Sequence, residues 1–232
     1  MKNSLVISEK FYSIQGEGQT MGVPSIFVRL AGCNILCQSD SWTCDSIEVW
    51  KKGTKTPFED VLTEKEVDRL SNGAHLIFTG GEPLLHQVAI VEYLKWFYKK
   101  YEFQPIIEVE TNGTIMPNKE MIMAVKYWNC SPKLANSGET AERRIKPAVI
   151  ERLNNLTGSI FKFVIDNEFD MEEISIDYGK YLSKDKVVLM PAGDSQEKLK
   201  QTRQLVAALC IKHRVRYSER LHIVIWNQKT GV

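Results

Sequence analysis

The stretch "SIFVRLAGCNILCQSDSWTCDS" (residues 25–46) joins an apolar, β-branched run to a segment that holds three cysteines within twelve positions. The apolar run is typical of a buried strand, because Ile and Val pack well on a pleated surface. Cys33, Cys37 and Cys44 follow it among glycine and polar residues, which is typical of a loop rather than of a hydrophobic core. The stretch therefore predicts a strand that delivers three thiols to one loop at its carboxyl end.

The composition is that of an ordinary globular protein. The 232 residues are 43% hydrophobic and 25% charged, enough for a sizeable core in one large domain or two small ones. A formal net charge of +1 leaves no basic excess to neutralise phosphates, so we expect no nucleic-acid partner. The amino-terminal "MKNSLVISEKFYSIQGEG" has no apolar signal segment, and no run approaches the roughly eighteen apolar residues of a membrane helix. We therefore expect a cytoplasmic protein without a membrane span, in which thiols stay reduced.

Strand-like and helix-like segments alternate along the chain. Thr63 and Glu66 stand at capping-box spacing before a short helix, apolar residues over 87–101 recur at helical spacing, and Asp194 and Glu197 mark the start of a long helix. This alternation predicts a mostly parallel sheet of about six strand–helix units, fewer than the eight of a closed barrel. The predicted strands cover residues 25–32, 74–81, 106–113, 158–166, 186–193 and 220–226, and one more ends at Ser131-Pro132.

Four unusual motifs come at the ends of these strands. In parallel strand–helix folds, functional groups cluster at the carboxyl ends of the strands. We therefore expect the motifs to share one site with the cysteine loop. They are "TGGEP" (79–83), "ETNG" (110–113), "SPK" (131–133) and "MPAG" (190–193).

The three loop cysteines are open to several interpretations: core residues, a zinc site, a disulfide with a spare thiol, or iron–sulfur ligands. Reduced thiols disfavour the disulfide, and zinc usually recruits four ligands, of which no fourth is evident. Three thiolates on a cubane cluster would leave one iron open to a substrate or cofactor. From the cysteines alone these alternatives remain open. We interpret Cys130 and Cys210 as small buried hydrophobic residues.

A strand, a Cys-x3-Cys pair, a third cysteine and then "GGEP" on the next strand together resemble the radical S-adenosylmethionine (SAM) superfamily. In that superfamily the open iron binds the amino and carboxyl groups of SAM. The resemblance implies an α/β fold, a partial, open (β/α)6-type barrel, in a single radical SAM domain over residues 1–232. It also implies that Gly81 and Glu82 hold the methionine end of SAM, where a carboxylate beside an amine makes a charge-assisted hydrogen bond.

Further motifs over nearly the whole chain narrow the resemblance to the 7-carboxy-7-deazaguanine synthases. That family contracts the ring of 6-carboxy-5,6,7,8-tetrahydropterin to 7-carboxy-7-deazaguanine, with loss of ammonia, in queuosine-type biosynthesis. The resemblance implies a [4Fe-4S] cluster, SAM, Mg²⁺, an electron donor such as flavodoxin or ferredoxin, and a homodimer. The motifs are "SIQGEG" (13–18), "FVR" (27–29), "CDS" (44–46), "EVETNG" (108–113), "SPK" (131–133), "LH" (221–222), Trp226 and the terminal "GV" (231–232).

The resemblance assigns a role to each matching residue. Cys33, Cys37 and Cys44 would bind three irons, and Ser46 would offer a hydroxyl to Mg²⁺, a cation that prefers oxygen ligands. Beside Gly81 and Glu82, the implied SAM contacts are Thr43, Asp45, Ser131, Pro132 and Lys133.

On the substrate side, Arg29 would pair with the pterin carboxylate as a two-pronged donor. Gln15 and Glu17 would read the donor edge of the pterin ring, because a carboxylate suits an amino and ring N–H pair. The other implied substrate contacts are Ile14, Gly16, Thr79, His222 and the terminal carboxylate of Val232. Glu108 and Glu110 share one face of their strand, and their role is open between structure and cofactor contact.

The cysteine spacing departs from the usual superfamily pattern. The second interval has six residues, where the superfamily commonly has two. Longer loops cost little entropy, so we expect the extra residues to bulge outward between Cys37 and Cys44. Two alternative functions are another radical SAM enzyme, such as a glycyl-radical activase, and a non-catalytic zinc-binding module.

Overall fold

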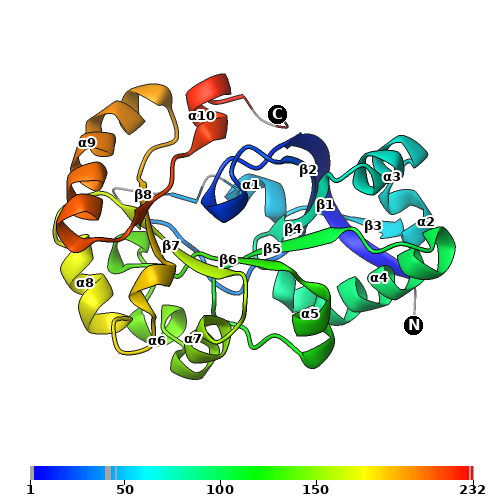
Figure 1. The fold of residues 1–232 in the computed structure, drawn as a ribbon, viewed down its shortest axis with the longest axis horizontal. Helices are drawn as coiled ribbons and strands as arrows, with labels where there is room; N and C mark the ends of the chain where they lie inside the picture. Colours follow the sequence, from blue (N-terminus) through cyan, green and yellow to red (C-terminus); the bar gives the residue numbers. More distant parts are fainter. Residues whose placement is uncertain (1–2, 40–42, 45, 230, 232) are drawn as a thin grey trace.

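The computed structural model describes residues 3–39, 43–44, 46–229 and 231. Within them, nine strands form one sheet in the order β3-β1-β2-β4-β5-β6-β7-β8-β9 (Figure 1). The strands are β1 (Ser4–Ile14), β2 (Pro24–Leu30), β3 (Thr54–Pro57), β4 (His75–Gly80), β5 (Ile106–Thr111), β6 (Tyr127–Cys130), β7 (Ser159–Ile165), β8 (Val187–Pro191) and β9 (Arg216–Tyr217).

Seven successive strands of the described sheet pair in parallel, which confirms the predicted parallel sheet: β2, β4, β5, β6, β7, β8 and β9. The sheet is open, since β3 and β9 lie at opposite ends of the strand order. Parallel pairing brings the ends of β2 and β4 level, with Arg29 beside Thr79 and Leu30 beside Gly80. The motifs that follow these strands therefore emerge on the same side.

An antiparallel extension adds β1 and β3 to the β2 edge, and the sequence did not predict it. The reason lies in its burial: of the eleven residues in β1, only Leu5 is buried. A strand with mixed polar and apolar residues on both faces has no clear period-two pattern.

Helices flank the sheet, and those from α4 to α9 form an arc along one side of it, whereas α10 lies on the other side (Figure 1). No helix in the described part of the chain is long and apolar enough to cross a membrane. The helices are α1 (Ile47–Trp50), α2 (Phe58–Val61), α3 (Glu64–Ser71), α4 (Gln87–Tyr101), α5 (Lys119–Ala124), α6 (Ala141–Arg144), α7 (Pro147–Asn154), α8 (Asp170–Asp177), α9 (Gln196–His213) and α10 (Leu221–Trp226), with 3-10 turns η1 (Gly18–Thr20), η2 (Pro83–His86), η3 (Ala135–Ser137) and η4 (Lys184–Lys186).

Two helix starts test the capping predictions. The capping box of Thr63 and Glu66 is present at α3, and its prediction is confirmed. The predicted cap of α9 is wrong by one residue, because the side chain of Ser195, not of Asp194, accepts the hydrogen bond from the Lys198 N–H. Asp194 instead pairs with the Lys198 ammonium at 3.1 Å.

The predicted strand over 220–226 is wrong, because these residues form the helix α10. The two-residue β9 takes the last place beside β8, and the Ser218 N–H then donates to the Leu189 carbonyl. The chain next turns towards the amino-terminal loop, where the Leu221 N–H donates to the Gly16 carbonyl at 2.8 Å. These apolar, β-branched residues thus form a short helix whose start is fixed by hydrogen bonds to residues distant in the sequence.

Candidate active site

The cysteine loop closes on itself after β2. The Cys44 N–H donates to the Cys37 carbonyl at 2.9 Å, and Gln38 and Thr43 form an antiparallel bridge beside it. Cys44 therefore lies next to Cys37, whereas the bulge predicted between them falls mostly on residues 40–42, which lie outside the described residues.

The three thiols influence one another. Burial raises the pKa of Cys37 to about 11; Lys133 lowers it, and negative charge on Cys44 and Cys33 raises it. Burial likewise raises the pKa of Cys33. Three thiolates in one loop repel, so a cationic metal cluster that binds all three would relieve that repulsion. Cys130 and Cys210 lie in the hydrophobic core, as predicted.

In the described ranges, no three His, Cys, Asp or Glu side chains are grouped tightly enough to hold one metal ion. A mononuclear zinc site needs such a group around a single tetrahedral centre. The cysteines of a cubane cluster need not surround a single ion, since each cysteine binds a different iron. Thiols are the donors that hold iron–sulfur clusters, and this loop carries three of them.

Asparagine and glutamate side chains hold the cysteine loop, and the sequence reasoning missed both. Asn112 donates from Nδ2 to Asn34 Oδ1 at 3.0 Å and faces Cys33 Sγ at 3.9 Å. Glu139 accepts a hydrogen bond from the Leu36 N–H with its carboxylate. The position of Asn112 within "ETNG" is the signal that could have found it.

The "TGGEP" motif lies directly under this loop. A Cβ on Gly81 would stand 2.3 Å from the Gly32 carbonyl oxygen and 2.5 Å from Cys33 Cβ, so only glycine fits there. The Glu82 N–H donates to the same Gly32 carbonyl at 3.0 Å. The end of β4 and the start of the cysteine loop are thus in close contact.

The Glu82 side chain is fully buried and held by several donors. Its carboxylate accepts from the Asn112 N–H at 2.7 Å and from Thr111 Oγ1 at 2.9 and 3.0 Å. Burial raises the pKa of Glu82 to about 7, because desolvation outweighs these hydrogen bonds and the charge of Lys133. The structure therefore places Glu82 beneath the loop, tied to the end of β5.

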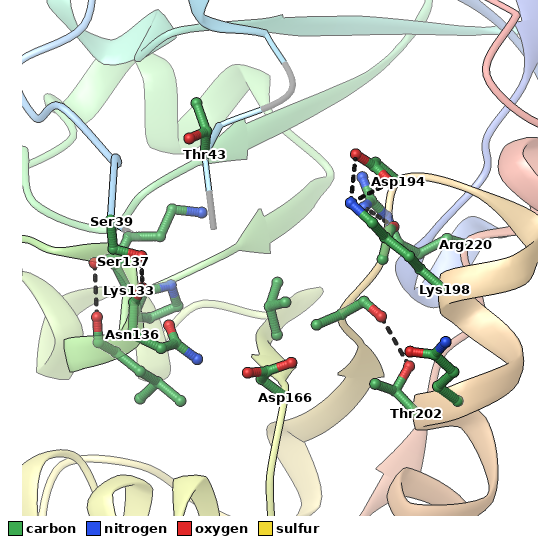
Figure 2. A pocket seen from close by; sticks show the side chains of 16 residues that line it. Ser39, Thr43, Lys133, Asn136, Ser137, Asp166, Asp194, Lys198, Thr202 and Arg220 are labelled. Carbon is green, nitrogen blue, oxygen red and sulfur yellow. Dashed lines mark hydrogen bonds and ion pairs between the residues drawn. The ribbon is translucent and has the colours of Figure 1, made fainter. Parts of the chain in front are cut away.

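A cavity of about 510 Å³ opens beside the cysteine loop, between the ends of β6, β7 and β8 (Figure 2). Three predicted SAM contacts, Thr43, Pro132 and Lys133, line it, and Lys133 Nζ donates to Ser131 Oγ at 3.1 Å. The sequence reasoning missed the opposite wall. Its polar residues are Asp166, Asp194, Lys198, Gln201, Thr202 and Arg220.

Arg29, Thr79 and Ser46 meet at the other side of the loop. Arg29 donates from Nη1 to Ser46 Oγ at 3.2 Å, and its Nε lies 2.7 Å from Glu9 Oε1. Thr79, the strand partner of Arg29, is buried. The predicted substrate-carboxylate residue and the predicted Mg²⁺ ligand are therefore neighbours.

A network of ion pairs holds the "QGEG" loop inside the barrel. Lys162 Nζ lies 2.8 Å from both Glu17 Oε2 and Glu110 Oε2, and Gln15 Nε2 donates to Glu110 Oε1 at 2.9 Å. Arg220 Nε lies 3.1 Å from Glu17 Oε1. Burial alone would raise the pKa of Glu17, but Lys162 and Arg220 outweigh it and hold that pKa well below its usual range.

The two glutamates of β5 have different surroundings, which separates roles that the sequence left open. Glu108 is fully buried and accepts from Thr20 Oγ1 at 2.7 Å and from Asn129 Nδ2 at 3.0 Å, with His75 on its other oxygen. These contacts tie together the interior of the sheet. Glu110 instead faces the "QGEG" loop through Lys162.

His222 reaches the same loop from α10 instead of from a strand. A Cβ on Gly16 would stand 2.2 Å from His222 Nδ1, so this glycine allows the close approach. Ile14 ends β1 directly before the loop. The predicted contacts Asp45 and Val232 lie outside the described residues.

Comparisons with known proteins point in one direction. Residues 14–126 match a family described as a 4Fe-4S single cluster domain. The 7-carboxy-7-deazaguanine synthase of Halobacterium salinarum is 36% identical, over 97% of this chain and 91% of that protein. The enzyme of the same name from Pyrobaculum aerophilum is 32% identical, over 97% and 96%. The crystal structure of QueE from Escherichia coli superposes with a TM-score of 0.68 at 25% identity, over 94% and 95% of the two chains.

Proposed function

The chain belongs to the 7-carboxy-7-deazaguanine synthase family, and on that premise we propose how its residues divide the work of the reaction. The enzyme is a radical SAM lyase that contracts the ring of 6-carboxy-5,6,7,8-tetrahydropterin in 7-deazapurine biosynthesis. The observation that supports the site best is the close contact of Gly81 with the Cys33 loop, which brings "GGEP" and the cysteines into one structure.

Cys33, Cys37 and Cys44 hold the [4Fe-4S] cluster in this proposal. Bound together, the cluster and SAM supply the radical that takes a hydrogen atom from the substrate. The protein supplies one loop that carries all three thiols, with Asn112 as a donor beside Cys33. Hydrogen bonds to ligand sulfurs are one means by which proteins tune such clusters.

SAM would bind in the cavity beside the loop, which Thr43, Pro132 and Lys133 line. Gly81 and Glu82 would hold its methionine end, and Thr43, Ser131, Pro132 and Lys133 its ribose and adenine side. The fully buried Glu82 acts chiefly by fixing the main chain at Asn112, because its carboxylate is already bonded there. The volume of about 510 Å³ is within the usual range for a ligand of this size.

The pterin lies between Arg29 and the "QGEG" loop. Arg29 pairs with the substrate carboxylate, and Thr79 adds a hydroxyl from the neighbouring strand. Gln15 and Glu17 accept hydrogen bonds from the donor edge of the ring, with Ile14, Gly16 and His222 around them. Charged acceptors in a buried site bind more strongly than neutral ones, and the low pKa of Glu17 keeps it ionised.

Ser46 provides an oxygen ligand for Mg²⁺ next to Arg29, which would place the cation beside the substrate carboxylate. Asp45 and Val232 keep their predicted roles as SAM and substrate contacts. We also propose a single domain over residues 1–232, a cytoplasmic homodimer, and flavodoxin or ferredoxin as the electron donor.

Anaerobic reconstitution tests the proposal. Protein loaded with iron and sulfide should convert the carboxytetrahydropterin to the deazaguanine acid when SAM, Mg²⁺ and dithionite are present, detected by mass spectrometry. Cys44→Ala should load less iron and form no product. A fully loaded enzyme that cleaves SAM but makes no deazaguanine acid would show that the substrate is wrong, as for a glycyl-radical activase. Zinc in place of iron would point to a metal-binding module.

A further inference from the structure

Lys162 lies inside the barrel between two carboxylates that come from different elements. It extends from β7, its side chain is 1% exposed, and its Nζ is 2.8 Å from Glu17 and 2.8 Å from Glu110. A buried lysine in a run of apolar strand residues is costly unless it is paired. The positive charge of Lys162 in this interior therefore depends on the two glutamates, and the negative charges of the glutamates depend on Lys162.

The second oxygen of each carboxylate has a different partner. Glu17 Oε1 has the guanidinium of Arg220, whereas Glu110 Oε1 accepts from the neutral amide of Gln15. Among the described residues, Lys162 is thus the one cation within ion-pair distance of Glu110. Burial raises the pKa of Glu110 and the nearby Glu17 charge raises it further, while Lys162 lowers it.

We propose that Lys162 is a positioning residue for substrate recognition: it holds Glu17 and Glu110 side by side as two anions that together accept the donor edge of a 2-amino-4-oxopterin. This inference rests on the proposed function. A 2-amino group and a ring N–H are donors, so a protonated carboxyl facing them would present a hydrogen where an acceptor is needed. The other charged or titratable groups around this cluster are Glu108 on β5, Cys130 on β6, and Arg220 and His222 from the carboxyl-terminal segment.

The test uses 6-carboxypterin, a fluorescent oxidised analogue, with cluster-loaded enzyme and SAM but no reductant. Lys162→Met should weaken binding by about tenfold to a hundredfold near neutral pH. Without Lys162 the Glu110 carboxyl is protonated, and its charge-assisted hydrogen bond to the pterin is lost. The dissociation constant of this variant should fall again as pH rises and Glu110 ionises. The wild-type profile should have its midpoint at lower pH.

Lys186→Met is the matched control. The Lys186 ammonium binds neutral groups at the end of α7 and just after it, donating to the carbonyls of Asn154 at 2.5 Å and Leu156 at 2.8 Å. Its loss removes a half-buried ammonium without touching either carboxylate. We expect its affinity for 6-carboxypterin and its pH profile to match the wild type.

The Glu110→Gln background separates positioning from folding. If Lys162 acts through the charge of Glu110, Lys162→Met should cost less affinity when Glu110 is already glutamine. An equal loss in both backgrounds, or an unchanged pH profile in Lys162→Met, would overturn the inference. Should Lys162→Met fail to fold, the double variant with Glu110→Gln answers the same question, because it lacks one charge of each sign. A midpoint of its binding pH profile as high as neutral pH, in the absence of the Glu110 carboxylate, would contradict the role given to Glu110.

The outcome for Lys162 is distinct from the outcome for the reaction. A wild-type enzyme that forms no deazaguanine acid from the carboxytetrahydropterin contradicts the proposed function, whatever the lysine variants do. Product formation together with wild-type 6-carboxypterin affinity in Lys162→Met contradicts only the role of the lysine.

Discussion

Replacing Gly81 with alanine tests whether a glycine is required beneath the cysteine loop. The new Cβ would stand 2.3 Å from the Gly32 carbonyl oxygen and 2.5 Å from Cys33 Cβ. Ordinary contact begins at about 3.5 Å, so the loop would have to move by about 1 Å. Overpacking of this kind costs about 1–3 kcal/mol, which for a chain of this size lowers Tm by about 2–12 °C.

The larger effect should fall on the cluster. Metal ligands must keep their distances within about 0.2 Å, and Cys33 moves with the loop. We therefore expect Gly81→Ala to retain less iron and sulfide per chain after anaerobic reconstitution, and to lose SAM cleavage in proportion. Iron and sulfide analysis measures the first effect, and chromatography of 5′-deoxyadenosine measures the second.

Gly179→Ala provides a matched control. A Cβ there would stand 2.4 Å from the Ser175 carbonyl oxygen, a comparable clash with the main chain at the end of α8. This variant should lose stability yet keep its cluster. Wild-type iron content in Gly81→Ala would refute the reasoning, and equal iron loss in both variants would attribute the effect to general instability.

Three further predictions concern single side chains. Burial raises the pKa of Glu82 to about 7 from 4.5, so its contribution to the stability of the cluster-free protein is full below about pH 4.5 and is lost as pH rises through 7. That loss is about 3 kcal/mol, and urea unfolding at several pH values should show a flatter dependence for Glu82→Gln. Arg29→Ala should raise the KM for the pterin by about tenfold to a hundredfold, while SAM cleavage without substrate stays near the wild-type rate; an unchanged KM would contradict its role. Ser46→Ala should raise the Mg²⁺ concentration needed for half-maximal product formation, and an identical titration would exclude the serine as a ligand.

Local patterns predicted most of the barrel. The helical spacing over 87–101 coincides with α4; the predicted strand at 25–32 overlaps β2, and those at 74–81 and 106–113 contain β4 and β5. The three strands are buried along most of their length and therefore read as continuous apolar runs, whereas α4 is buried along one face and its apolar residues recur at helical spacing. The strands β1 and β3, at the antiparallel end of the sheet, have few buried residues, so the sequence shows no comparable apolar pattern there.

The candidate site was predicted unevenly for a similar reason. Residues inside motifs, such as Gly81 and Arg29, could be found because the motif itself is local. Lys162 and Arg220 could not, since their importance comes from ion pairs to Glu17 over more than a hundred positions. The one local sign was a lysine in the apolar run "SIFKFVI".

The carboxyl-terminal segment shows how a motif can be right where the local pattern is wrong. Apolar residues at 220–226 predicted a strand, yet Arg220 donates to the Gly193 carbonyl at 2.6 Å and pairs with Glu17, and the Leu221 N–H donates to Gly16. These contacts fix the start of α10 between the end of β8 and the "QGEG" loop. A residue one position after Leu221 must then lie beside Gly16, which is where the structure places His222. The position of His222 at the site therefore depends on the contacts of Arg220 and Leu221, and not on whether a strand or a helix carries it. Removing the Arg220 guanidinium should displace His222, even though no residue of α10 takes part in the ion pair between Arg220 and Glu17.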